Sequence, residues 1–281
     1  SQGRGNSQAL ADRMWGSGVL PTKFQGVKFR SGKDPVLYLS NPDGYTAGAR
    51  RRFLDDLGQL NQMRLEEYQD PEIATRISQY EMAFRMQTAV PEATDLSGEP
   101  QSVLDLYGPD AKKPGSFAAS CLLARRMVER GVRMVQIFHQ GWDQHGALPR
   151  NLRLQCEDID HASAGLIRDL KDRSILDRTL VLCMGEFGRT PSINPAGGRD
   201  HWPGGFSIAL AGGGIRGGQV IGETDPDGKK EPAHPVHVGG LFATVFSALG
   251  IDYQKINQTP IGRTVKFSEG MPLEKLIERG G

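Results

Sequence analysis

Residues 132–138 have the sequence VRMVQIF, a largely apolar run that predicts a buried β-strand. Apolar residues then recur in alternating steps of four and three from Pro149 to Asp172, which predicts a helix with one buried face. A second buried strand is predicted from Thr179 to Met184. A strand, a helix and a strand in this order, with almost continuously apolar strands, indicate a right-handed crossover in a parallel sheet covered on both faces. We therefore expect an α/β fold.

The rest of the chain adds helices and short strands around this unit. Helical spacing of apolar residues predicts a helical pair near residues 46–90, broken at Asp70 and Pro71, because Asp is a good N-cap and Pro suits the first helical position. One domain over residues 1–281 is expected, with the pair as an annex within it. The remaining expected elements are loops over 1–45, a helix over 116–130, strands over 205–211 and 219–221, and helices over 241–249 and 273–277.

Composition and charge place the chain among ordinary globular proteins. Of its 281 residues, 38% are hydrophobic and 24% are charged, and the formal net charge of +1 gives no electrostatic case for nucleic acid or an anionic membrane surface. No apolar segment approaches the roughly 20 residues that a membrane span needs. The N-terminus lacks a signal-peptide pattern. The chain begins with a polar run at Ser1 rather than at Met, so a processed product or a fragment of a longer protein is expected.

An acid and an imidazole follow the first predicted strand, in the sequence GWDQHG at residues 141–146. The carboxyl end of a strand is where α/β folds build their ligand sites. Asp143 and His145 are separated by one residue, so in extended chain both side chains project to one side. Together they suit Zn²⁺, Mn²⁺ or Fe better than Mg²⁺ alone. The alternative is a polar loop in which Asp143 caps a turn and His145 faces water.

Two further loops carry candidate site residues. Glu186 follows the second predicted strand, and it is either a metal ligand or a buried anion paired with Arg189, because an unpaired buried charge is costly. Arg189 could instead clamp a tetrahedral oxyanion with its planar fork of donors. Asp200 and His201 lie in a loop dense in Gly and Pro, and adjacent side chains usually point apart. We favour His201 as the ligand, with Asp200 supporting it or serving as an alternative ligand. The three loops predict one metal or anion site.

Other motifs give weaker signals. His237 precedes a predicted helix and is a minor candidate ligand. The glycines of residues 212–217 match the dinucleotide pattern G-x-G-x-x-G, but no helix follows them, so a turn between strands is the better interpretation. There is no G-x-S-x-G motif, and Cys183 lies within an apolar run where a thiolate would be disfavoured. A serine or cysteine hydrolase triad is therefore unsupported.

Six motifs considered together resemble a known family. They are WGSGVLP at 15–21, QGV at 25–27, DPVLYLSNP at 34–42, GWDQH at 141–145, GEFGRTP at 185–191 and GRDHWP at 198–203. Their combination spans nearly the entire chain and resembles the sulfatase-like bacterial family catalogued as domain of unknown function 1501, which is similar to the alkaline phosphatase superfamily. Members are usually longer, so the chain is identified as the C-terminal part, with a further metal-binding aspartate and any Ser, Thr or Cys nucleophile expected upstream of Ser1.

The resemblance implies a fold, an activity and a location. The fold would be a three-layer α/β/α sheet of the alkaline-phosphatase type, mostly parallel, with the helical pair near 46–90 inserted or appended. The activity would be hydrolysis of a phosphate or sulfate ester, on a small molecule or a polysaccharide, by a periplasmic or secreted protein. Arg189 would be catalytic and would steady the anion. A divalent metal, Zn, Mn or Ca, would be bound by Asp143, His145, Glu186, Asp200 and His201.

One departure from the family pattern supports a second hypothesis. Glu186 and Phe187 stand where the better-studied phosphatases and sulfatases carry an Asp-His pair, and Phe187 cannot coordinate a metal. The chain could therefore be a degenerate, non-catalytic relative that serves as an exported binding or assembly protein. The two hypotheses differ in geometry, because a hydrolase needs the four side chains of Asp143, His145, Glu186 and His201 within ligand reach of one point.

Overall fold

The computed structural model describes residues 16–17, 24–30, 35–36, 39–230, 232–259 and 262–278. The chain divides into two compact units, of which the larger includes Pro100–Gln258 and the C-terminal residues from Gly262, and the smaller includes Ala9–Glu99. The expected loops over residues 1–45 lie largely outside the described residues. None of the helices in the described part is long and apolar enough to cross a membrane.

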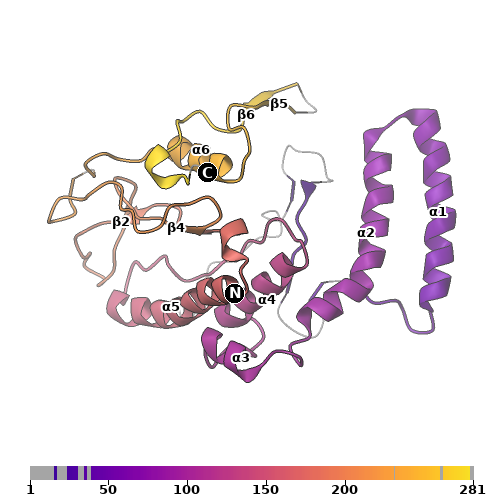
Figure 1. Ribbon diagram of the computed structural model, residues 1–281, viewed down its shortest axis with the longest axis horizontal. Coiled ribbons are helices and arrows are strands. Elements are labelled where there is room, and N and C mark those ends of the chain that lie inside the picture. Colours follow the sequence, from indigo (N-terminus) through magenta and orange to yellow (C-terminus); the bar gives the residue numbers. More distant parts are fainter. Residues whose placement is uncertain are drawn as a thin grey trace. The chain divides into compact units, whose positions relative to one another are not determined.

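The smaller unit contains the predicted helical pair. Helices α1 (Ala47–Tyr68) and α2 (Pro71–Thr94) lie side by side (Figure 1), and the break falls at Asp70, whose side chain accepts a hydrogen bond from the Glu72 amide at 2.9 Å. Arg51 of α1 donates to both carboxylate oxygens of Glu81 of α2, at 3.0 and 2.6 Å. The prediction of two helices with a break at Asp70 and Pro71 is confirmed, since capping and proline geometry are local properties of the sequence.

The larger unit has a core of three packed helices, α3 (Gln101–Tyr107), α4 (Phe117–Glu129) and α5 (Leu148–Asp172). Helix α4 begins after Ser116, whose hydroxyl accepts a hydrogen bond from the Ala119 amide at 2.9 Å, as the sequence predicts. Helix α5 contacts both α3 and α4. Its close approach to α3 requires Gly165, because a Cβ there would lie 2.1 Å from the backbone oxygen of Leu106. Between these helices lie the buried residues Leu104, Tyr107, Cys121, Leu122, Ala162 and Leu170.

A buried charge network joins the same three helices. The Asp169 carboxylate accepts hydrogen bonds from the Tyr107 hydroxyl at 2.8 Å and from Nε of Arg173 at 2.7 Å, and it lies 2.9 Å from Nε of Arg125. The side chains of Arg125 and Asp169 are only 2% and 3% exposed. Burial raises the pKa of Tyr107, so its hydroxyl stays a donor. Asp169 therefore connects α5 to α3 and α4 by charge as well as by packing.

The strands of the described residues form three two-stranded antiparallel sheets. Strand β1 (Leu180–Cys183) pairs with β4 (Ala209–Gly212), and β2 (Gly188–Arg189) pairs with β3 (His201–Trp202). Strand β5 (Ile256–Gln258) pairs with β6 (Thr264–Lys266). The remaining elements are the 3₁₀ helices η3 (Leu176–Arg178) and η4 (Glu274–Leu276) and the helix α6 (Val238–Ala248).

The expected three-layer α/β/α sheet of the alkaline-phosphatase type is therefore wrong. Residues 132–138 form no strand, and within them Met134 is 83% exposed. Strand β1 occurs where the second buried strand was expected, but its partner is the later β4 in antiparallel register, so no parallel crossover exists in the described part of the chain. Residues 219–221 also form no strand. An apolar run predicts burial without specifying its pairing partner, and here the partner differs from the expected one.

Candidate metal centre

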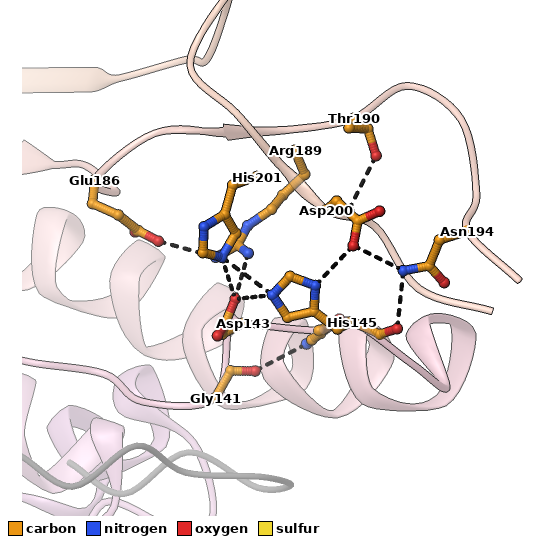
Figure 2. Close-up of polar contacts among 10 residues, drawn as sticks. Gly141, Asp143, His145, Glu186, Arg189, Thr190, Asn194, Asp200 and His201 are labelled. Atoms are coloured by element: carbon orange, nitrogen blue, oxygen red, sulfur yellow. Dashed lines mark hydrogen bonds and ion pairs between the residues drawn. The ribbon is translucent and has the colours of Figure 1, made fainter. Parts of the chain in front are cut away.

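Three side chains from two distant parts of the chain converge on one point (Figure 2). Asp143 and His145 come from the loop before α5, and His201 comes from β3. The Asp143 Oδ1 atom lies 2.8 Å from Nε2 of His201 and 2.9 Å from Nε2 of His145, and the two Nε2 atoms are 3.2 Å apart. Candidate ligand atoms of all three residues lie within 4.8 Å of one another.

The loop that carries Asp143 and His145 is fixed by the residue between them. Gln144 is buried, and its amide nitrogen donates a hydrogen bond to the Gly141 carbonyl at 3.1 Å. Because neighbouring side chains in extended chain alternate, an inward Gln144 leaves Asp143 and His145 on the outer side. The Gly141 φ angle of 98° favours glycine, and a Cβ there would lie 2.4 Å from the Gln155 side chain. The predicted common orientation of Asp143 and His145 is thus explained by packing behind them.

The second loop is held by the short β2–β3 ladder and by a close backbone approach. In this ladder Arg189 lies opposite His201. The Thr190 amide donates to the Asp200 carbonyl at 2.9 Å, which continues the pairing into the loop. Gly198 lies against the His145 backbone, where a Cβ would be 2.0 Å from the His145 carbonyl carbon. Glycine at 198 therefore allows the two loops to meet.

Asp200 orients the His145 ring from the side away from the other two residues. Its Oδ1 lies 2.9 Å from Nδ1 of His145. In the tautomer with its proton on Nδ1, His145 donates to Asp200 and its Nε2 lone pair faces Asp143. The hydrogen bond from His145, followed by one from Asn194, lowers the pKa of Asp200. A carboxylate on the outer nitrogen of an imidazole is the usual support of a metal-binding histidine. Asp200 thus occupies the supporting position that the sequence left open for it, next to His145 rather than His201.

The centre brings an ionised carboxylate close to an imidazole nitrogen. Hydrogen bonds from His201 and then from Arg189, which donates at 2.6 Å, lower the pKa of Asp143 to about 2. The ionised Oδ1 then lies 2.9 Å from the His145 lone pair, and two acceptors at that distance repel each other. Either a second proton on His145 or a metal ion between the two atoms removes this repulsion.

The spacing of the three atoms fits a metal of the zinc type. With ligand bonds of about 2.0–2.1 Å, neighbouring ligand atoms of a tetrahedral site lie about 3.3 Å apart. The triangle of Asp143, His145 and His201 has sides of 2.8, 2.9 and 3.2 Å, slightly below that value. Two imidazoles and one carboxylate also match the donor preference of Zn²⁺, Mn²⁺ and Fe. The residues present therefore fit a divalent transition metal.

The other two predicted site residues lie at the edge of this triad. Glu186 accepts a hydrogen bond from Nη2 of Arg189 at 3.0 Å, and its carboxylate is not among the converging ligand atoms. It is paired with Arg189, as in the ion-pair alternative, but its side chain is 56% exposed and not buried. Arg189 lies between the two acids, with Nη1 on Asp143 and Nη2 on Glu186. Phe187 contacts the His201 ring, with centroids 4.5 Å apart, and so packs against a ligand without binding metal.

The minor candidate His237 and the excluded nucleophile Cys183 have other positions. His237 is the N-cap of α6 and accepts a hydrogen bond from the Gly239 amide at 3.2 Å, which gives it a structural role at a helix terminus. Cys183 is the last residue of β1 and is exposed, whereas the sequence placed it inside an apolar strand.

Asn194 is the site residue that the sequence did not reveal. Its Nδ2 donates to Asp200 Oδ1 at 3.0 Å and to the His145 carbonyl at 3.1 Å. Its Oδ1 accepts from the amides of Ala196 and Gly198, both at 3.0 Å. The Asn194 side chain thus holds its own turn, the Asp200 carboxylate that supports His145, and the backbone of His145. The available signal was its position before Pro195 in a glycine-rich loop, since Asn often bonds to nearby backbone in turns.

Replacing Asn194 with Ala is expected to weaken metal binding about tenfold, because Asp200 and the His145 backbone lose a common support while all three ligands stay. The measurement is a competition titration with a chromophoric chelator. Asn194→Asp is the matched comparison, since it keeps the acceptor for Ala196 and Gly198 but loses the donor to Asp200. An affinity unchanged in both variants would show that Asn194 does not position the site.

Comparisons with known proteins identify a family and nothing more specific. A family model described as "Protein of unknown function (DUF1501)" matches residues 1–277. No curated protein and no solved structure gives a significant match to the chain.

Proposed function

We propose that this chain, which belongs to the DUF1501 family, is a metal-dependent hydrolase of phosphate or sulfate esters. Asp143, His145 and His201 would hold the ion. The convergence of their ligand atoms within 4.8 Å of one another carries the proposal. Glu186, the fourth side chain expected at the centre of a hydrolase, is not among them, so the proposal rests on three ligands. The resemblance that suggests an ester also suggests export, so the proposed substrate is a small-molecule or polysaccharide ester met in the periplasm or outside the cell.

The number and exposure of the ligands favour catalysis over a purely structural site. Structural zinc sites are closed by four protein ligands, whereas catalytic sites use three and leave a position open. The side chains of His145 and His201 are 46% and 49% exposed, so a substrate can reach the ligand triangle. A divalent ion bound there would polarise the ester and offset the negative charge that develops on its oxygens.

Arg189 is proposed to steady the anionic ester beside the metal. Its guanidinium has five N–H donors, and Nη1 and Nη2 are oriented by Asp143 and Glu186. Stacking over Phe187, at 5.3 Å from the ring centroid, further limits its movement. A guanidinium held in advance loses little entropy when it binds an oxyanion, which is what stabilisation of developing charge requires.

The rival proposal is a non-catalytic protein, with or without a bound metal. Arg189 already bonds to two carboxylates, and this partial neutralisation favours a non-catalytic binding or assembly protein. In that case a bound ion would shape the surface loops around Asp143 and His201 without acting on an ester. Turnover by the metal-loaded protein separates the two proposals.

The test is hydrolysis of an aryl phosphate and an aryl sulfate by the protein loaded with Zn²⁺, Mn²⁺ or Ca²⁺. We expect metal-dependent turnover, and Arg189→Lys is expected to lower kcat/KM about tenfold, since Lys lacks the planar fork of donors. Metal affinity is measured on the same sample, so that loss of the anion contact is distinguished from loss of the ion. Metal binding without turnover of either ester would favour the rival, and the absence of metal binding would overturn the hydrolase proposal.

A further inference from the structure

Helix α1 has an exposed apolar stripe on the side away from α2. Arg51 faces α2, where it bonds to Glu81. Leu60 lies nine residues further on, which is two and a half turns in a helix of about 3.6 residues per turn, so it lies on the opposite side of α1. Phe53, Leu60 and Met63 are 48%, 60% and 66% exposed and recur at helical spacing. The stripe is therefore separate from the contact that holds the hairpin together.

The charges beside this stripe are arranged symmetrically about Leu60. Asp56 precedes Leu60 by one helical turn and Arg64 follows it by one turn, and both are exposed. Neither has a hydrogen bond or ion pair within the part of the chain that the structure describes. Arg52 and Tyr68 lie one further turn out on either side and are also exposed. Arg52, Asp56, Leu60, Arg64 and Tyr68 thus form one row at intervals of four. Rows with this spacing are the ridges that fit into the groove of a neighbouring helix when two helices pack.

We propose that this face of α1 binds α1 of a second copy of the chain, crossing it in antiparallel direction at Leu60. A two-fold axis at Leu60 places Asp56 of each copy opposite Arg64 of the other. The same axis places Arg52 opposite Tyr68, a pair suited to a cation–π contact. Phe53, Leu60 and Met63 supply the apolar area at the crossing. The row is complementary to itself, which commits the surface to a second copy rather than to an unrelated partner.

Charge exchange tests this arrangement directly. The full chain, Asp56→Arg, Arg64→Asp and the double variant are compared by sedimentation equilibrium over a range of protein concentrations. The unaltered chain is expected to dimerise. Each single variant puts like charges opposite each other twice in the interface and should raise the dimer Kd at least about tenfold. The double variant restores opposite charges and should return the Kd to within a few-fold of the original value.

Two controls test whether a change in dimer Kd arises at the exposed stripe of α1. Asp56 and Arg64 are eight residues apart, about 12 Å along the helix, so the double variant cannot recover through a contact within α1. Gln62→Arg adds a charge on the other side of α1 and should leave the Kd unchanged. A monomeric chain at all concentrations, or single variants that dimerise normally, would overturn the proposal. A monomer whose Tm falls in Leu60→Asp would also overturn it, because the stripe would then be covered within one chain.

Discussion

Asp169→Ala is expected to lower the free energy of unfolding by about 3 kcal/mol, because it removes the carboxylate of a buried charge network. Asp169 bonds to Tyr107 and Arg173 and pairs with Arg125, whose side chain is 2% exposed. Without Asp169, Arg125 keeps Glu129 at 2.7 Å as a partner but stays largely out of water. The measurement is urea-induced unfolding monitored by circular dichroism. The free energies of the variant and the unaltered chain are compared provided that the dependence on urea concentration, the m-value, is the same for both.

Asp172→Ala is the matched control for this prediction. Asp172 lies on the same helix and also pairs with an arginine four residues away, Arg168, at 3.2 Å. Both side chains of that pair are more than half exposed, at 68% and 52%, so solvent screens their attraction. The expected loss is between about 0 and 1 kcal/mol. Equal losses in the Asp169 and Asp172 variants would show that burial does not explain the stability lost in Asp169→Ala.

The helices of this chain could be predicted because their signals are local. Ser116 caps α4, Asp70 caps α2, and the apolar stripe from Pro149 predicts nearly all of α5. Each of these features depends on residues within one or two turns of one another. The residues of each helix and its cap are therefore enough to predict that helix.

Strand pairing could not be predicted in the same way. Residues 132–138 and β1 are similar apolar runs, yet the first forms no strand and the second pairs with β4. Apolar character indicates burial, whereas pairing depends on which distant segment reaches the backbone of the strand. The resemblance to an alkaline-phosphatase-like family also led to the wrong fold, since the motifs at 141–145, 185–191 and 198–203 lie mainly in loops and specify no strand pairing.

The candidate site was partly predictable because its residue types are distinctive. Asp143, His145 and His201 were chosen for their chemistry, and the structure brings their ligand atoms together. Glu186 had two possible roles, and only its distance to Arg189 distinguishes them. Asn194 offered only a local turn signal, because three of its four side-chain hydrogen bonds lie within its own loop and only the one to the His145 carbonyl joins two loops.

His201→Ala is expected to weaken Zn²⁺ binding about a hundredfold or more. Structural zinc sites with four ligands bind with about 10–16 kcal/mol, so one ligand contributes about 3 kcal/mol, and each 1.4 kcal/mol is tenfold in affinity. His201 is one of three converging ligands, and its side chain is 49% exposed, so its removal leaves little buried space. The fold should therefore survive, and the loss should appear in affinity rather than in Tm of the metal-free protein.

The affinity is measured by competition with a chromophoric chelator, and His161→Ala provides the control. His161 is exposed on α5, where its Nε2 lies 3.2 Å from the Asp105 carbonyl, and it has no contact with the triad. Its replacement should leave the Zn²⁺ affinity within a few-fold of the original. Added Zn²⁺ should raise the Tm of the unaltered chain and of His161→Ala, because a ligand that binds only the folded state stabilises it. If His201→Ala shows the same increase at the same Zn²⁺ concentration, the ion binds elsewhere on the chain.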